Sequence, residues 1–179
     1  MITVRQASMF NGFRYVALDT NGQHVGQFEF PWRAQAGNAR LRWHERGSTA
    51  GDVQLAVRGE SGQQSYQIRH DYLTRRAHPD MRYSLLQKEE VLASAEVLQQ
   101  TGLRGPRIHL RQPFAAQLTR TSRQLGLRTG WRLHQGAHSI GTLEEPAALM
   151  LRQSWVLHLP TDISLPVQLF LAFLVRQLH

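Results

Sequence analysis

Cysteine is absent from this sequence of 179 residues, and lysine occurs only once, as Lys88. The lack of cysteine excludes disulfides, thiolate zinc sites and a cysteine nucleophile within the chain. Apolar residues make up 41% of the sequence and charged residues 19%, which is typical of a folded protein and argues against disorder. Since a domain usually takes roughly 150 residues, we predict a single domain over residues 1–179.

Acidic residues are missing from a long stretch, because none occurs between Glu96 and Glu144. The stretch instead contains Arg104, Arg107, Arg111, Arg120, Arg123, Arg128 and Arg132, together with His109, His134 and His138. The whole chain has a formal net charge of +8. Seven arginines without opposing carboxylates would attract an anionic surface, so they are our candidate anion-binding residues. Arginines that only alternate outward from strands into solvent would give the same pattern.

The sequence also has no recognisable leader and no apolar run long enough to span a membrane. Residues 1–6 do not show a charged leader followed by an apolar stretch, so we expect a cytoplasmic location. Near the end of the chain, Ser164 suits a helix N-cap and Pro166 suits the first turn. We predict a helix over residues 165–177, about 20 Å long. A helix that spans a membrane needs about two more turns than this one has.

This predicted helix is apolar on every side, because residues 169–175 read Leu-Phe-Leu-Ala-Phe-Leu-Val. A helix of this kind is normally surrounded by protein. We therefore predict that it is central and buried, with insertion of the tail into a membrane as the alternative.

The rest of the chain is patterned as short strands between turn residues. Strands are expected at 13–19, 24–30, 38–46, 52–58, 65–72, 81–86, 91–98, 107–111, 114–120, 124–128, 130–135, 139–144, 148–151 and 154–159. Residues 88–100 could equally form a helix. About twelve strands make a barrel whose interior is too wide for its own side chains to fill. We therefore predict a mainly β fold, a closed antiparallel barrel of about twelve strands around the central hydrophobic C-terminal helix.

Two hairpins of the sequence have the same form. In residues 15–29 a strand leads through Asn21-Gly22 into a return strand containing Gly26, and residues 131–144 repeat the form with Gly141. A glycine within a strand indicates a β-bulge or a close approach of another backbone, which we expect at both positions.

These hairpins and the segment 155–166 before the apolar helix also carry a family resemblance. The aromatic-x-hydrophobic…Asn-Gly-x-x-Val-Gly hairpin and the Trp-x-Leu…Gly-x-x-x-Ile-Gly hairpin resemble the tubby C-terminal-like superfamily, which includes phospholipid scramblase-like and LURP-one-related proteins. The resemblance covers nearly the whole chain and implies a twelve-stranded barrel around a C-terminal helix. Tubby-type domains bind phosphoinositide headgroups, and scramblase-type proteins are linked to lipid movement and calcium. No tubby-type phosphoinositide motif can be matched residue by residue here.

Signals for other chemistry are weak. His134 and His138 are separated by a turn and lack a third ligand for a metal ion. Before the last helix, Asp162 provides a single carboxylate, whereas a calcium site needs about six to eight oxygen ligands. Residues 19–22 are expected to form a turn, and the four tryptophans, Trp32, Trp43, Trp131 and Trp155, to lie in the core or at its rim. We expect no metal and no cofactor.

The leading hypothesis is a non-enzymatic module that binds anionic phospholipid headgroups through the arginine-rich stretch. A small-ligand or enzymatic barrel with a pocket at its mouth is the first alternative. A nucleic-acid-binding protein is the second, and an acidic protein is a further possible partner.

Overall fold

The computed structural model describes most of the chain. The described residues are 1–8, 11–29, 53–59, 62–74, 79–99, 106–121, 130–146 and 153–178. The strands expected at 38–46, 124–128 and 148–151 lie outside these residues, as do Trp32 and Trp43.

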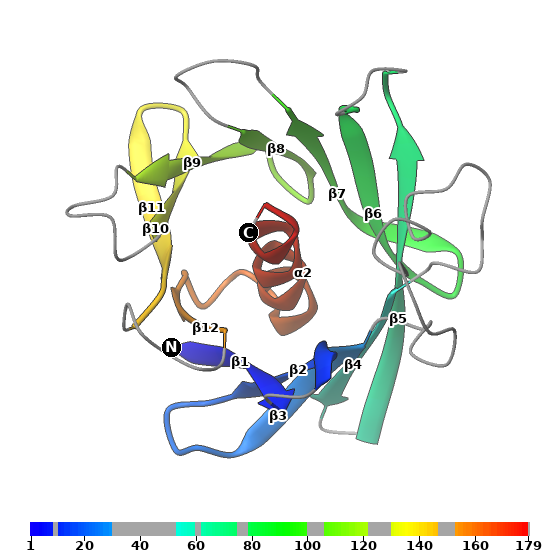
Figure 1. Cartoon of the computed structure of the whole chain (residues 1–179), viewed down its shortest axis with the longest axis vertical. Helices are drawn as coiled ribbons and strands as arrows, with labels where there is room; N and C mark the ends of the chain where they lie inside the picture. Colours follow the sequence, from blue (N-terminus) through cyan, green and yellow to red (C-terminus); the bar gives the residue numbers. More distant parts are fainter. Residues whose placement is uncertain are drawn as a thin grey trace.

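Twelve strands of the described residues form a closed antiparallel barrel (Figure 1). Each strand pairs with its neighbours in sequence, and β1 closes the barrel against β12. The strands are β1 (Ile2–Ser8), β2 (Asn11–Leu18), β3 (His24–Glu29), β4 (Val53–Gly59), β5 (Gly62–Tyr72), β6 (Met81–Gln87), β7 (Glu90–Leu98), β8 (Arg107–Gln112), β9 (Ala116–Thr121), β10 (Gly130–Gln135), β11 (His138–Glu144) and β12 (Ser154–His158). The predicted fold class is confirmed.

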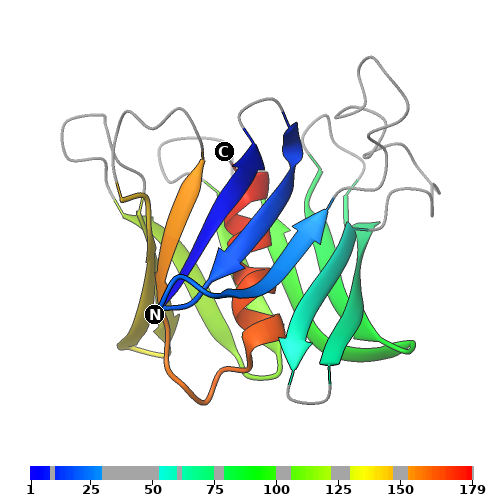
Figure 2. The ribbon, with the colours of Figure 1, turned by 90° about the horizontal axis from the view of Figure 1, so that it is seen from below.

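The helix α2 (Leu165–Gln177) runs along the axis of the barrel (Figures 1 and 2). Its buried side chains are Val167, Leu169, Phe170, Leu171, Ala172, Phe173, Leu174 and Val175. Phe173 stands edge-on to Phe28 of β3 and Tyr83 of β6, with ring centroids 6.0 and 5.6 Å apart. The helix also packs against β4, β7 and β12, so it contacts the barrel wall on more than one side, as expected of an all-apolar helix.

The start of α2 agrees with the prediction in position but differs in how it is capped. Ser164 precedes the helix and Pro166 lies in its first turn, yet the Ser164 side chain makes no capping hydrogen bond. Its backbone carbonyl accepts a bond from the Gln168 amide at 3.0 Å. The Gln168 side-chain Nε2 donates to the Ile163 carbonyl at 2.7 Å. A glutamine within the helix thus holds the residue before the N-cap.

The segment that could have been a helix is the strand β7. Ala93, Ala95 and Val97 alternate inward along it and are buried, which is the period of a strand and not of a helix. The turn from β6 places Lys88 and Glu89 at positive φ, 48° and 71°.

Gly26 and Gly141 lie beside irregularities of the ladder, as predicted. The register shifts between Ala17 and Leu18 opposite the first glycine, and between Leu133 and His134 opposite the second. A Cβ on Gly26 would stand 2.7 Å from Cδ1 of Leu169 in α2 and 2.9 Å from the Ala56 carbonyl oxygen. The bulge and the missing side chain therefore let the wall approach the helix and the neighbouring strand.

The first strand, β1, was not predicted. Val4 faces the interior and is buried, but the next inward position holds Gln6, which is only 8% exposed. The backbone amide of Gln6 donates to the Gln153 carbonyl at 2.9 Å, and the Gln6 side-chain Oε1 accepts from the Gln153 backbone amide at 3.4 Å. A polar residue in an inward position interrupts the apolar alternation by which the other strands were found.

We predict that Gly26→Ala lowers the free energy of unfolding by roughly 1–3 kcal/mol, because the new methyl group overlaps Leu169 and a backbone oxygen. Urea denaturation followed by circular dichroism would measure the loss. The double variant Gly26→Ala/Leu169→Ala should lose less stability than the sum of the two single losses, since truncating Leu169 relieves one of the overlaps. An unchanged midpoint for Gly26→Ala would contradict the close packing of helix and wall.

Candidate functional site

Three adjacent strands, β8, β9 and β10, contain no aspartate or glutamate and make up the acid-free sector of the barrel. They pair in the order β8–β9–β10. The nearest carboxylates on the flanking strands are Glu96 of β7 and Glu144 of β11. The described strands of the acid-free stretch are thus adjacent in the wall.

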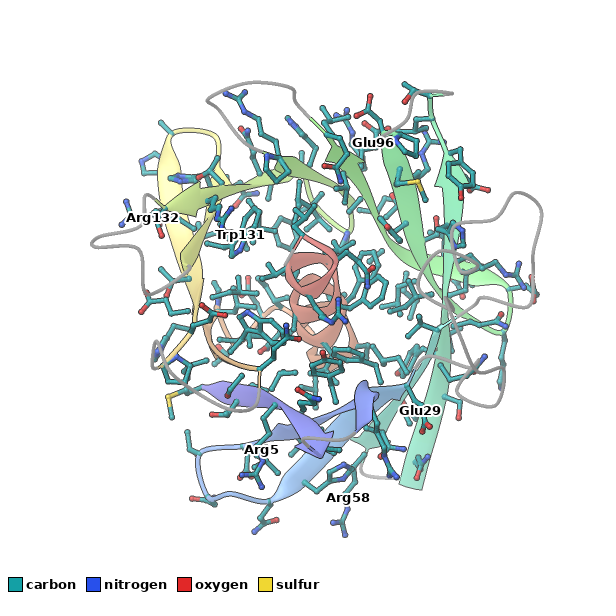
Figure 3. The ribbon with its side chains drawn as sticks, in the orientation of Figure 1. Arg5, Glu29, Arg58, Glu96, Trp131 and Arg132 are labelled. Carbon is teal, nitrogen blue, oxygen red and sulfur yellow. The ribbon has the colours of Figure 1, made fainter. Side chains whose placement is uncertain are left out.

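Three of the candidate arginines point outward from this sector. Arg107 and Arg111 occupy alternate positions of β8, on the opposite face from the buried Ile108 and Leu110. Arg132 is exposed on β10 and projects away from the barrel beside the inward-pointing Trp131 (Figure 3).

Arg120 does not share this outer surface. It lies on β9 directly opposite Trp131 of β10, so its side chain starts from the inner face of the wall. Its Nε atom is buried. We therefore leave Arg120 out of the outer surface. Arg104, Arg123 and Arg128 lie outside the described residues.

The register of the sector arranges two arginines and two histidines around β9. Gln117 of β9 stands between His109 of β8 and His134 of β10, and Thr119 is paired with Arg132. Arg107 and Arg132 each precede their histidine by two residues and so share its side of the sheet. Strands two places apart are about 10 Å from each other. We call these four residues, Arg107, His109, Arg132 and His134, the outer basic face.

Within the described part of the chain, neither Arg107 nor Arg132 lies within ion-pair distance of a carboxylate. The outward residues of the neighbouring strand β9, Gln117 and Thr119, are uncharged. These two arginines retain their charge for an external anion.

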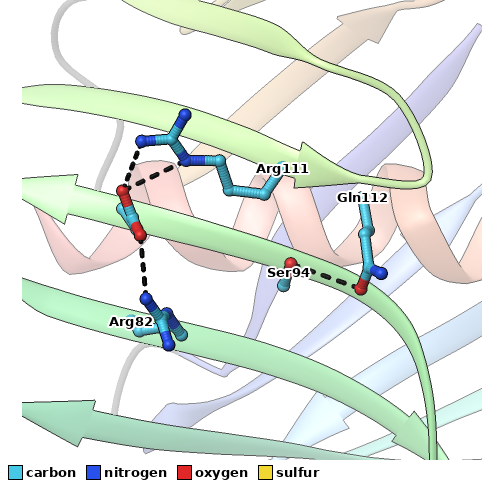
Figure 4. Close-up of polar contacts among 5 residues, drawn as sticks. Arg82, Ser94, Arg111 and Gln112 are labelled. Atoms are coloured by element: carbon cyan, nitrogen blue, oxygen red, sulfur yellow. Dashed lines mark hydrogen bonds and ion pairs between the residues drawn. The ribbon is translucent and has the colours of Figure 1, made fainter.

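Arg111 is different, because Glu96 neutralises it across the ladder (Figure 4). One oxygen of Glu96 accepts bonds from Nη2 and Nε of Arg111, at 2.6 and 3.1 Å. The other oxygen accepts from Nη2 of Arg82 on β6 at 3.1 Å. The Glu96 side chain is only 15% exposed between the two arginines. The expectation that all seven arginines are unopposed is therefore wrong for Arg111.

The neighbouring charges shift the titration of two groups. Hydrogen bonds from Arg111 and then Arg82 hold the pKa of Glu96 below its ordinary value. Burial, followed by the positive charges of Arg111 and Arg107, lowers the pKa of His109, while Glu96 acts in the opposite direction. The imidazole of His109 is therefore mainly neutral at neutral pH.

A polar cluster inside the barrel was missed by the sequence analysis. Arg176 near the end of α2 donates from Nε to the Tyr15 hydroxyl at 2.8 Å, and this hydroxyl donates to Oε1 of Gln153 at 2.7 Å. The guanidinium also lies 5.8 Å from the centre of the Tyr15 ring. The cluster fastens the end of the helix to β2 and to the start of β12. Its only sequence signal is the change from apolar residues to Arg176.

The remaining candidates behave as structural residues. Asp19 accepts bonds from the amides of Asn21 and Gln23 through one oxygen, at 2.8 and 2.9 Å, which is the predicted turn. Trp131 and Trp155 are buried in the core, as expected. Among the described residues, no three histidine or acidic side chains gather in a way that could hold a metal ion.

Comparison with other proteins adds no relative to this picture, since no family model, curated protein or solved structure matches the chain. In the part of the chain that the structure describes, no helix has both the length and the apolar character to cross a membrane.

We predict that Glu96→Gln destabilises the protein by roughly 1 kcal/mol or less at neutral pH, because both arginine partners are about half exposed. Since folding lowers the pKa of Glu96, its stabilisation is complete above the unfolded value and disappears as pH falls through the folded value. Thermal unfolding of both proteins should therefore converge below about pH 3. A stability difference that is constant from neutral to acid pH would contradict this role.

Proposed function

We propose that this protein is a non-enzymatic module that binds the headgroups of anionic phospholipids at a membrane surface. The observation that carries the proposal is the acid-free sector, from which Arg107, Arg111 and Arg132 project outward. A guanidinium group offers a planar fork of donors that matches the oxygens of a phosphate. An open polar outer wall with such donors suits a layer of headgroups better than it suits one small molecule.

The expected strength is that of a peripheral, reversible contact. A basic side chain close to an anionic leaflet contributes about 1 kcal/mol. Arg107 and Arg132 have no carboxylate partner among the described residues, so they would contribute most of the attraction. Salt would weaken it, since surface charges are screened over about 10 Å at moderate ionic strength.

The two alternatives have less support. Single-stranded nucleic acid is usually bound on exposed aromatic rings, whereas Trp131 and Trp155, the tryptophans that the structure describes, are 1% and 0% exposed. A ligand pocket inside the barrel would compete with α2, whose residues from Leu169 to Val175 are all fully buried there.

The proposal includes the relationship to the tubby C-terminal-like superfamily and a cytoplasmic, membrane-peripheral location. The relationship is supported by the architecture, a closed twelve-stranded barrel with a C-terminal helix along its axis. Fold alone does not transfer an activity. The arginines therefore carry the functional argument, and the family likeness does not.

We predict that the double variant Arg107→Gln/Arg132→Gln binds anionic vesicles at least tenfold more weakly than the wild type, because it removes two charges from the outer basic face. The probe is a mixed phosphatidylglycerol–phosphatidylcholine vesicle, and sedimentation with the full chain measures binding.

The matched control is Arg5→Gln/Arg58→Gln, which also removes two positive charges but from β1 and β4, on other parts of the wall (Figure 3). If both double variants lost vesicle binding equally, the loss would follow from net charge alone, and this would contradict binding through the outer basic face. Binding of single-stranded DNA with the same arginine dependence, and no vesicle binding, would favour the nucleic-acid alternative.

We further predict that Glu96→Gln strengthens vesicle binding by roughly fivefold, because it leaves Arg82 and Arg111 without their shared carboxylate. The same sedimentation measurement applies. Glu29→Gln, on β3, serves as a control that removes one negative charge far from the acid-free sector (Figure 3). A Glu96→Gln variant that binds no better than Glu29→Gln would show that Arg111 takes no part.

A further inference from the structure

The outer basic face contains two imidazoles at equivalent positions. His109 on β8 and His134 on β10 are both register partners of Gln117 on β9, so one row across the wall reads histidine, glutamine, histidine. Each histidine is the second residue after an outward arginine on its own strand. An anionic layer that touches Arg107 and Arg132 would therefore also lie over both imidazoles.

The charged groups around His109 come from three directions. Glu96 is its register partner on β7, and Arg107 and Arg111 flank it on β8. On the other side, Gln117 separates it from His134. The two oxygens of Glu96 are already bonded to Arg111 and Arg82, so the carboxylate is shared with these guanidinium groups.

The surroundings of His134 contain no carboxylate in register with it. Its partners are Gln117 on β9 and Ser139 on β11, and Arg132 precedes it on β10. Glu144 lies at the far end of β11, paired with Gly130. Both imidazoles are thus placed beside arginines in a sector without acids of its own.

The placement of His109 disfavours its charged form in the unbound protein and favours that form in the bound one. Beside arginine and partly removed from water, His109 has a lowered pKa and is mainly neutral at neutral pH. A layer of phosphates over the face reverses the local field and stabilises the protonated ring. By linkage, a ligand that favours protonation must itself bind more tightly as pH falls.

We propose that His109 and His134 make the binding of anionic headgroups by the outer basic face pH-dependent, so that the protein docks more tightly on a mildly acidic membrane surface. The inference rests on the proposed function and adds its regulation. The arginines give a constant attraction, and the two histidines add up to two charges only when they are protonated. A charge near an anionic leaflet strengthens binding roughly fivefold, so the pair should add roughly tenfold or more between pH values of about 7.5 and 5.5.

The test measures vesicle binding of the full chain at these two pH values. The probe is phosphatidylglycerol mixed with phosphatidylcholine, because a phosphodiester keeps its single negative charge across this range. The proteins compared are the wild type, His109→Gln, His134→Gln and the double variant. His24→Gln is the matched control, because His24 is exposed on β3, outside the acid-free sector. Circular dichroism at both pH values checks that each protein is folded.

The inference predicts that lowering the pH strengthens binding of the wild type and of His24→Gln to the same extent. Each single variant on the face should keep part of the effect, and the double variant should lose it. As a second readout, the imidazole resonance of His109 should titrate at higher pH when a soluble short-chain phosphatidylglycerol is added.

The possible failures separate the two proposals. Wild-type binding that is equal at both pH values, or a double variant with the full wild-type effect, would overturn the inference and leave the proposed function standing. No binding of the wild type to these vesicles at either pH would overturn both.

Discussion

The enclosure of α2 is the constraint on which the rest of the structure depends. A helix with side chains is about 10 Å wide, and from Leu169 to Val175 this one has no polar side to turn toward water. Only a wall that surrounds it can bury such a surface. The twelve described strands meet this requirement by closing on themselves, so none of these twelve has an unpaired edge.

Enclosing a helix fixes which side chains the wall presents to solvent. Along every strand the inward positions must contact α2 or its neighbours, so the alternate positions face outward and can be polar. Trp131 and Arg132 illustrate the rule, since adjacent residues of β10 serve the core and the surface. Arg120 shows its consequence, because its parity with the buried Leu118 places it on the inner face. Position within the strand therefore decides which arginines can meet a partner.

Much of this architecture could be read from the sequence, and the exceptions have physical causes. The barrel and the bounds of the helix followed from strand alternation and from an apolar run with a clear start. β1 was missed because Gln6 occupies an inward position, where its side-chain oxygen accepts a bond from the backbone amide of Gln153, which is remote in sequence. The pairing of Glu96 with Arg111 could not be predicted either. It depends on the register between β7 and β8, which shifts between Ser94 and Ala95, and no local pattern specifies such a shift.

The same register determines which arginines are paired with a carboxylate and which are not. Glu96 joins β6, β7 and β8 through Arg82 and Arg111, so these two guanidinium groups mainly fasten the wall and add little to an external field. Arg107 and Arg132 lie beside β9, whose outward Gln117 and Thr119 are uncharged and cannot compete for them. An arginine is available to a partner only where its own sheet offers no carboxylate. By this criterion, only part of the formal net charge of +8 attracts an anionic partner, namely the arginines that have no carboxylate on a neighbouring strand.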